Sequence, residues 1–158
     1  MSAIIKGDLR VHIRWMIRRD YVEVQEIENA SFDYPWDEAD FLRELKKRNV
    51  IGMVAEYQEH ILGYMVYELH PTQIEISNFA VAPSARRRGV GSRMVAKLMG
   101  KLSDRRQRLT LVCRESNLAG HLFWKASGFQ AKRVIRGAFA DTDEDGYLFV
   151  ARFKELAS

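Results

Sequence analysis

Apolar and polar positions follow two different spacings along the chain, which predicts a mixture of strands and helices. Short runs rich in apolar and β-branched residues predict strands at 10–17, 50–57, 61–69, 74–82, 109–113, 129–135 and 147–153. Helices are predicted after the capping residues Asp20 and Asp37, over 90–102, and over 117–126 with a stop at Gly128. Strand 74–82, helix 90–102 and strand 109–113 form a β-α-β unit, so the order predicts an α/β fold with a mixed α+β sheet.

Length and composition point to one globular domain. The chain has 158 residues, of which 47% are hydrophobic and 29% charged. We expect an N-terminal extension over 1–9 and a single domain over 10–158. One cysteine excludes an internal disulfide framework, and no apolar run approaches the ~18–20 residues that span a bilayer. The charged first residues do not resemble a secretory signal, so we expect a cytoplasmic protein without a membrane partner.

Positive charge is concentrated in one segment, although the net charge is only 25 − 21 = +4. Nine cations lie there, opposed only by Asp104: Arg86, Arg87, Arg88, Arg93, Lys97, Lys101, Arg105, Arg106 and Arg108. Such a segment favours a polyanionic ligand, either nucleic acid or a phosphorylated cofactor. The alternative is a basic helix face that only contacts solvent.

The stretch Arg86-Arg87-Arg88-Gly89-Val90-Gly91 connects a predicted strand to the start of a predicted helix. A helix N-terminus presents unpaired N–H groups, which suit a phosphate. Glycines let the backbone approach that ligand, and the arginines add positive charge. The stretch lacks the Gly-Lys-Ser/Thr of a P-loop, and Met94 takes the place of the third glycine of a dinucleotide fingerprint. By itself, such a Gly-x-Gly could also be an ordinary turn.

The surrounding sequence resembles the GNAT superfamily of acetyl-CoA-dependent N-acetyltransferases. Arg-x-x-Gly-x-Gly after a strand that ends in Phe79-Ala80-Val81-Ala82-Pro83 is similar to the cofactor motif of that family. Further similar segments are Ser116-Asn117, Leu122-Phe123-Trp124-Lys125 and Gly128-Phe129. Segment 27–36 and tail 141–149 are similar to the subgroup that acetylates protein N-termini, above all the ribosomal-protein alanine acetyltransferases. The resemblance covers about residues 10–153.

The resemblance implies a central mixed sheet, splayed between two strands and flanked by about four helices, with acetyl-CoA as the donor. Backbone groups of Phe79, Ala80 and Val81 would pair with the pantetheine arm, although Phe79 and Val81 could also be core residues. The loop residues that would wrap the pyrophosphate are Arg86, Arg87, Arg88, Gly89, Val90, Gly91 and Ser92. Asn117 would contact the pantetheine from the other side, and Trp124 is a further cofactor-binding candidate.

The catalytic groups depart from the subgroup. Val112 stands where the subgroup has a glutamate, Trp124 where it has a tyrosine acid, and Ala138-Phe139 where it has a Tyr-Tyr pair. An indole N–H donates a hydrogen bond but gives up no proton near neutral pH. Glu75 lies where many other GNAT enzymes place their glutamate, so we expect it to be the general base. The alternative is a strand residue that faces solvent.

No metal is expected. The four histidines lack metal-ligand spacing and have no cysteine partner. Asp141-x-Asp143-x-Asp145-Gly146 begins like a calcium loop, but its twelfth position is Arg152 rather than glutamate. An acidic hairpin loop is therefore predicted there, and Cys113 is predicted to be a buried apolar residue.

We therefore expect acetyl transfer from acetyl-CoA to a primary amine, by direct attack in a ternary complex. The expected acceptor is the α-amine of a protein or peptide N-terminus, such as that of a ribosomal protein, with Phe32, Tyr34 and Trp36 along one wall. The alternatives are a small-molecule amine, a lysine side chain, or an acyl-CoA-binding module without catalysis. Nucleic acid is not an expected partner, because no stacking aromatics interleave with the arginines.

Overall fold

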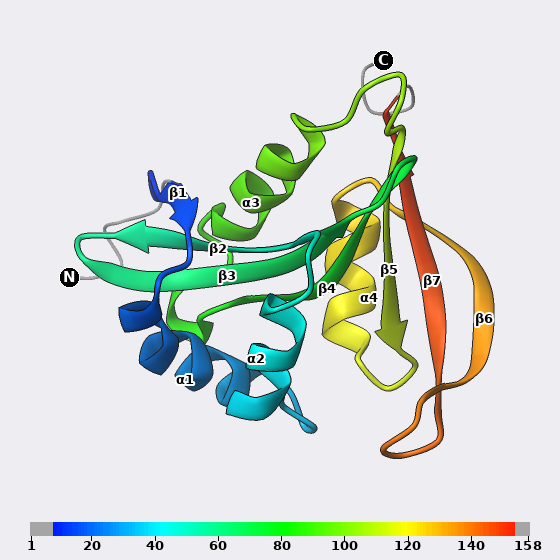
Figure 1. Ribbon diagram of the computed structural model, residues 1–158, viewed down its shortest axis with the longest axis horizontal. Coiled ribbons are helices and arrows are strands. Elements are labelled where there is room, and N and C mark those ends of the chain that lie inside the picture. Colours follow the sequence, from blue (N-terminus) through cyan, green and yellow to red (C-terminus); the bar gives the residue numbers. More distant parts are fainter. Residues whose placement is uncertain (1–7, 154–158) are drawn as a thin grey trace. The chain divides into compact units, whose positions relative to one another are not determined.

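A computed structural model describes residues 8–153, so most of the expected extension 1–9 lies outside the described residues. The strands are β1 (His12–Trp15), β2 (Val50–Tyr57), β3 (His60–Leu69), β4 (Gln73–Val81), β5 (Arg108–Arg114), β6 (Gln130–Phe139) and β7 (Glu144–Arg152). The α-helices are α1 (Tyr21–Ser31), α2 (Glu38–Leu45), α3 (Val90–Met99) and α4 (Leu118–Ala126). The predicted order of elements is confirmed (Figure 1).

The strands form one sheet in the order β1-β2-β3-β4-β5-β7-β6. β4 and β5 are parallel, whereas β1–β2, β2–β3, β5–β7 and β6–β7 are antiparallel, so the mixed sheet is confirmed. The parallel pairing runs from Gln73↔Arg108 to Glu75↔Thr110. Both strands continue past this stretch, β4 to Val81 and β5 to Arg114.

The described chain divides into two compact units. The first comprises the residues up to Glu68 together with Asn78–Lys97, and the second comprises Leu69–Ser77 together with the residues from Leu98 onward. Strand β4 contributes to both units. Among the described residues, no helix combines the length and apolar character needed to cross a membrane.

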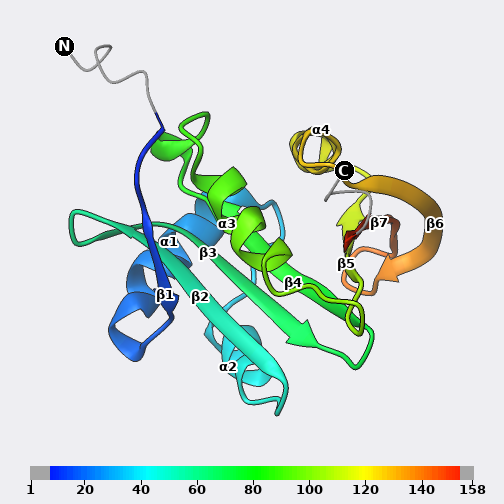
Figure 2. The same cartoon turned by 90° about the horizontal axis from the view of Figure 1, so that it is seen from above.

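In the first unit, α1 and α2 lie on one face of β2 and β3, and α3 lies on the other (Figures 1 and 2). Val24 and Ile27 of α1 and Phe41 of α2 are buried against Tyr64 and Val66 of β3. On the α3 side, Gly63 permits close approach, since a Cβ there would lie 2.8 Å from the sulfur of Met94. The helices thus present their apolar stripes to the strands.

In the second unit, α4 packs on β5 and β7. The His121 ring lies edge-on to Tyr147 and Phe149, at centroid distances of 5.0 and 5.3 Å. The helix stops before Gly128, whose φ of +95° is the left-handed conformation predicted for that position.

The caps differ between the first two helices. Asp37 caps α2 as predicted, because its Oδ1 accepts the Asp40 N–H at 2.9 Å. Asp20 is the N-cap residue of α1, as predicted, but its side chain makes no capping hydrogen bond to this helix. Its carboxylate instead accepts the Ile17 N–H at 2.8 Å and both terminal nitrogens of Arg14. The guanidinium holds the pKa of Asp20 below its usual range.

Candidate active site

The loop between β4 and α3 contains the predicted phosphate-binding stretch. A short 3-10 helix, Pro83–Ala85, leads into it, and α3 begins at Val90. Arg87 and Gly89 have positive φ values of +64° and +79°. The Arg93 N–H donates to the Gly89 carbonyl at 3.0 Å, so Gly89 provides the first carbonyl of the helix. The N–H groups of residues 90–92 belong to this first turn, which leaves them without helical carbonyl partners.

Two arginines of the loop are held in different ways. Arg86 donates from Nε to the Val81 carbonyl at 3.1 Å and from Nη2 to Ser31 Oγ at 3.0 Å, which fastens the loop to β4 and α1. Arg88 has a buried Nε and a buried Nη2 that find no hydrogen-bond partner in the described part of the chain. Buried donors without partners are costly, so Arg88 is suited to receive an anionic ligand.

A carboxylate already lies against this loop. The Leu9 N–H donates to the Arg88 carbonyl at 2.9 Å, which brings the neighbouring Asp8 to Gly89. A Cβ on Gly89 would fall 2.5 Å from the Asp8 carboxyl carbon. The absence of a side chain at Gly89 therefore leaves room for a negatively charged group, so the loop fits a phosphate. Sequence reasoning missed this contact, because Asp8 fell within the expected extension.

The three residues predicted to face the pantetheine lie at the end of β4, in the same unit as the loop. The Phe79 N–H donates to Asn78 Oδ1 at 2.9 Å. Ala80 is buried, whereas Phe79 and Val81 are half-buried. The Val81 carbonyl receives Arg86, so the structure brings this strand end and the loop together.

Glu28 is a buried carboxylate that sequence reasoning did not single out as a site residue. Its side chain accepts hydrogen bonds from the Tyr64 hydroxyl, from Asn78 Nδ2 at 2.7 Å and from the Trp36 N–H at 2.8 Å. Burial raises the pKa of Glu28, and the three hydrogen bonds oppose that rise. Glu28 thus joins α1, β3, β4 and the segment before α2.

The predicted acceptor wall is divided between core and surface. Phe32 and Trp36 pack against the core of the first unit, and Trp36 lies edge-on to Phe41 at a centroid distance of 5.1 Å. Tyr34 is 51% exposed. The Trp36 carbonyl receives Gln25 Nε2 at 2.7 Å, and its N–H is bound by Glu28. Glu28 and Gln25 therefore fix the backbone at Trp36, next to the exposed Tyr34.

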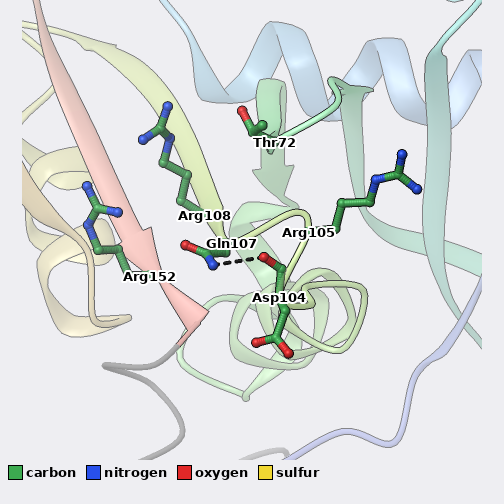
Figure 3. A pocket seen from close by; sticks show the side chains of 6 residues that line it. All are labelled: Thr72, Asp104, Arg105, Gln107, Arg108 and Arg152. Carbon is green, nitrogen blue, oxygen red and sulfur yellow. Dashed lines mark hydrogen bonds between the residues drawn. The ribbon is translucent and has the colours of Figure 1, made fainter.

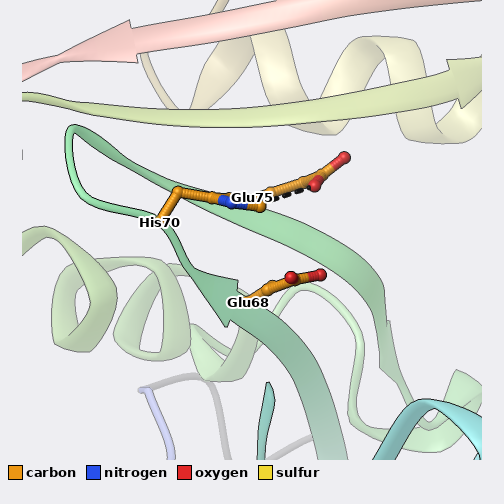
Figure 4. Close-up of side chains that lie close together, drawn as sticks. All are labelled: Glu68, His70 and Glu75. Carbon is orange, nitrogen blue, oxygen red and sulfur yellow. Dashed lines mark hydrogen bonds and ion pairs between the residues drawn. The ribbon is translucent and has the colours of Figure 1, made fainter. Parts of the chain in front are cut away.

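The predicted base, Glu75, lies on β4 in the second unit. Its Oε1 is 3.0 Å from His70 Nε2, and its side chain is 45% exposed (Figure 4). Glu68, also drawn in that figure, belongs to the first unit. A carboxylate that is reachable from solvent and held by one imidazole can accept a proton directly or through water. The assignment of Glu75 as the base stays a prediction.

Asn117 and Trp124 also belong to the second unit. Asn117 is the N-cap of α4, where its Oδ1 accepts the Gly120 N–H at 2.9 Å. Its Nδ2 amide remains as the group that a pantetheine would meet. Trp124 is buried and lies edge-on to Phe123 and Phe129 at 4.9 and 5.0 Å. Cofactor contacts by both residues stay predictions.

The structure confirms two sequence predictions, a buried Cys113 and an acidic hairpin between β6 and β7. Cys113 is buried, and burial raises the pKa of its thiol to about 11, so it is a neutral thiol near pH 7. Arg114 donates to Asp141 at 2.7 Å and to Glu144 at 3.2 Å, and it lies over the Phe139 ring. The acidic hairpin between β6 and β7 is thus bound by a cation of this chain.

Comparison with known proteins identifies the class. The model of the acetyltransferase (GNAT) family matches residues 21–129, which is more than half of the chain. The chain belongs to this family, and it is an N-acetyltransferase.

Three individual proteins are similar to this chain in sequence or in fold. A protein of Bacillus subtilis (strain 168), named "Putative ribosomal protein bS18-alanine N-acetyltransferase", is 26% identical over 90% of this chain and 96% of its own. The crystal structure of the Escherichia coli ribosomal-protein-S18-alanine N-acetyltransferase superposes with a TM-score of 0.77 at 20% identity, covering 91% of this chain and 94% of that one. A GNAT acetyltransferase from Elizabethkingia anophelis, solved with acetyl-CoA bound, gives 0.73 at 16% identity, covering 90% and 97%.

Proposed function

We propose that the protein transfers the acetyl group of acetyl-CoA to the α-amine of a protein or peptide N-terminus. The observation that supports the donor is the loop 86–92, where a carboxylate lies at Gly89 and two buried Arg88 nitrogens have no hydrogen-bond partner among residues 8–153. A family member with acetyl-CoA bound supports the same donor. In this proposal, N–H groups at the start of α3 and the Arg88 guanidinium hold the pyrophosphate.

The acceptor is supported by the names of the relatives and by the chemistry of amines. Two relatives are named as alanine N-acetyltransferases of ribosomal protein S18. An α-amine has a pKa of about 7.7–8.0, so roughly a tenth is neutral at pH 7. A lysine amine, at about 10.4, is neutral in fewer than about one molecule in a thousand. With Val112 and Trp124 in place of the subgroup's glutamate and tyrosine, an acceptor that needs little help in losing its proton is favoured.

The chemical step follows from this assignment. The neutral amine nitrogen attacks the thioester carbonyl carbon, the C–N bond forms, and the C–S bond breaks as coenzyme A leaves. The proton lost by the amine goes to the Glu75 carboxylate, directly or through a water molecule. His70, 3.0 Å from Glu75, orients that carboxylate. A ribosomal acceptor also implies a cytoplasmic enzyme.

A competition between two peptides tests the proposed acceptor. One peptide has a free N-terminal alanine and a blocked lysine, and the other has a blocked N-terminus and a free lysine. We expect acetyl-CoA-dependent labelling of the N-terminal peptide, located by mass spectrometry, to be faster at pH 7. Faster labelling of the lysine peptide would show that the acceptor class is wrong. Acetyl-CoA binding without turnover on any amine would indicate a binding module.

A further inference from the structure

Three arginines surround a hollow in the second unit that the proposed function does not use. Arg108 begins β5, Arg152 ends β7, and Arg105 lies in the loop before β5. The hollow has a volume of about 280 Å³ (Figure 3). Its other lining residues are Thr72, Asp104 and Gln107.

Arg108 and Arg152 are direct partners across the antiparallel β5–β7 pair. Side chains at such positions lie on the same face, with Cβ atoms about 4.5–5.5 Å apart, and like charges there are destabilising. Arg108 Nε donates to the neutral Gln73 Oε1 at 2.8 Å. Within residues 8–153, neither arginine forms an ion pair with a carboxylate. Asp104, the only acidic residue among the described residues that line the hollow, turns its carboxylate away from both guanidinium groups (Figure 3).

The other end of β5 provides a contrast. There Arg114 is bound by Asp141 and Glu144, so its positive charge is compensated by the chain itself. At the Arg108 end, no carboxylate of residues 8–153 compensates the charge of the cross-strand pair. Among the described residues, two guanidinium groups without a carboxylate partner are therefore a feature of the hollow and not of the whole strand.

The walls of the hollow are held by backbone hydrogen bonds. The Gln107 N–H donates to the Thr72 carbonyl at 3.1 Å, and the Phe153 N–H donates to the Gln107 carbonyl at 2.8 Å. Arg106 Nε donates to the His70 carbonyl at 2.8 Å. The loop before β5 is thus bound both to the turn before β4 and to the end of β7. A site with fixed walls does not have to be ordered when a ligand binds.

We propose that this hollow binds the phosphate group of a small phosphorylated molecule. A phosphate monoester carries close to two negative charges at pH 7, which matches the pair Arg108 and Arg152. Guanidinium groups bind such oxygens in bidentate geometry, and the Thr72 hydroxyl offers a further donor. The volume suits a compact group, because sites for larger ligands occupy roughly 300–1,000 Å³. None of the lining residues that the structure describes is aromatic, so these residues offer no surface on which the bases of a nucleic acid could stack.

Thermal unfolding of the full chain tests the site, with inorganic phosphate as the probe and sodium chloride at matched ionic strength as the reference. We expect phosphate to raise the Tm in a saturable manner beyond the effect of chloride. In Arg152→Gln, the phosphate affinity derived from this shift should fall about tenfold or more, because a charged hydrogen-bond donor is lost. Arg133→Gln is the matched control, since Arg133 is an exposed arginine of β6 outside the hollow.

The Tm of the variants without phosphate distinguishes a specific site at Arg152 from a general effect of removing one positive charge. Without phosphate, Arg152→Gln should unfold at a higher temperature than the wild-type chain, because the cross-strand repulsion is removed, whereas Arg133→Gln should not. Gly91→Val alters the loop 86–92, which is itself proposed to bind phosphate groups, so this variant should keep the part of the phosphate response that Arg152→Gln loses. Loss of that part in Gly91→Val, or wild-type affinity in Arg152→Gln, would overturn the proposal. Tighter binding of a short single-stranded RNA than of phosphate, lost in Arg152→Gln, would overturn the assignment to a small molecule.

Discussion

Glu28 in the first unit and Glu75 in the second are held in opposite ways. Glu28 is 1% exposed and accepts hydrogen bonds from Tyr64, Asn78 and Trp36. Glu75 has a side chain that is 45% exposed, and a single imidazole, that of His70, lies beside it. A carboxylate whose oxygens are all engaged supports the fold, whereas one that solvent and ligands can reach is available for proton transfer. The comparison therefore indicates a structural role for Glu28 and agrees with the prediction that Glu75 is the general base.

The largest effect is expected at Glu75. Glu75→Gln keeps the shape and removes the basicity, so turnover should fall by roughly 10²–10⁴-fold if Glu75 is the general base. The affinity for acetyl-CoA should persist, and the free energy of unfolding should change by less than about 0.5 kcal/mol, as for other exposed positions. Steady-state kinetics, calorimetry and urea unfolding measure the three quantities.

Glu115→Gln serves as the control for this substitution, because Glu115 is an exposed glutamate of the same unit. Wild-type turnover of Glu75→Gln at pH 7 would show that Glu75 is an ordinary strand residue that faces solvent. The comparison with Glu28 would then no longer support a catalytic role for Glu75.

The opposite behaviour is expected at Glu28. Glu28→Ala leaves three donors without their acceptor in the core, so the free energy of unfolding should fall by about 3–5 kcal/mol. Urea unfolding measures this loss. Glu26→Ala, an exposed glutamate on the same helix, should cost less than about 0.5 kcal/mol. Equal effects of the two substitutions would show that the Glu28 network contributes nothing to stability.

Local signals explain why much of the fold was predictable. The Asp37 cap acts within one helical turn, and Gly128 directly follows its helix, so neighbouring residues determine both. Gly89 adopts the positive φ that a glycine in such a loop allows. The four-residue spacing of apolar residues in α3 likewise reports the buried face of that helix.

The features that were missed depend on contacts with other elements of the structure. In the sequence, Glu28 looks like any other helical glutamate, because its hydrogen-bond partners are distant: Asn78 lies 50 residues later, and Tyr64 belongs to β3. Asp20 appeared suited to cap a helix, but the nearby Arg14 binds its carboxylate instead. The glycines of the sequence could place the loop that is proposed to bind phosphate. Sequence reasoning could not foresee the Asp8 carboxylate at Gly89, because that contact joins residues 81 positions apart.

The loop of the first unit provides a test of donor binding. Gly91→Val adds a side chain where the pyrophosphate is proposed to lie, so the affinity for acetyl-CoA should fall at least about tenfold, or 1.4 kcal/mol. Arg87→Ala, which removes an exposed side chain of the same loop, should weaken binding less. Calorimetry measures both, with urea unfolding as the check that each variant is folded. An unchanged affinity in Gly91→Val would show that the donor does not bind at this loop.

Asn117 separates structural and ligand-binding roles in the second unit. Asn117→Ala removes the N-cap of α4 and should cost about 1 kcal/mol of stability. Asn117→Asp keeps an acceptor for the Gly120 N–H and lacks only the amide donor, so stability should be retained. If the amide contacts the pantetheine, Asn117→Asp alone should weaken acetyl-CoA binding. Wild-type affinity in this variant would leave Asn117 as a cap only.

The mildest substitution, Glu28→Gln, tests whether burial raises the pKa of Glu28, because it changes how stability depends on pH. Burial raises the pKa of Glu28, so the unfolded chain releases this proton at a lower pH than the folded chain does. Above the unfolded pKa the unfolded state binds fewer protons, and the stability contributed by Glu28 falls as pH rises towards its folded pKa.

The substitution Glu28→Gln abolishes that fall. It also places an amide donor among three donors, at a cost that does not depend on pH. The stability of Glu28→Gln relative to wild type, from urea unfolding, should therefore be more favourable at pH 7 than at pH 4. Carboxylates with lowered pKa, such as Asp20, contribute equally to both proteins and cancel in this difference. A difference that is constant with pH would show that the folded chain holds Glu28 at its ordinary pKa.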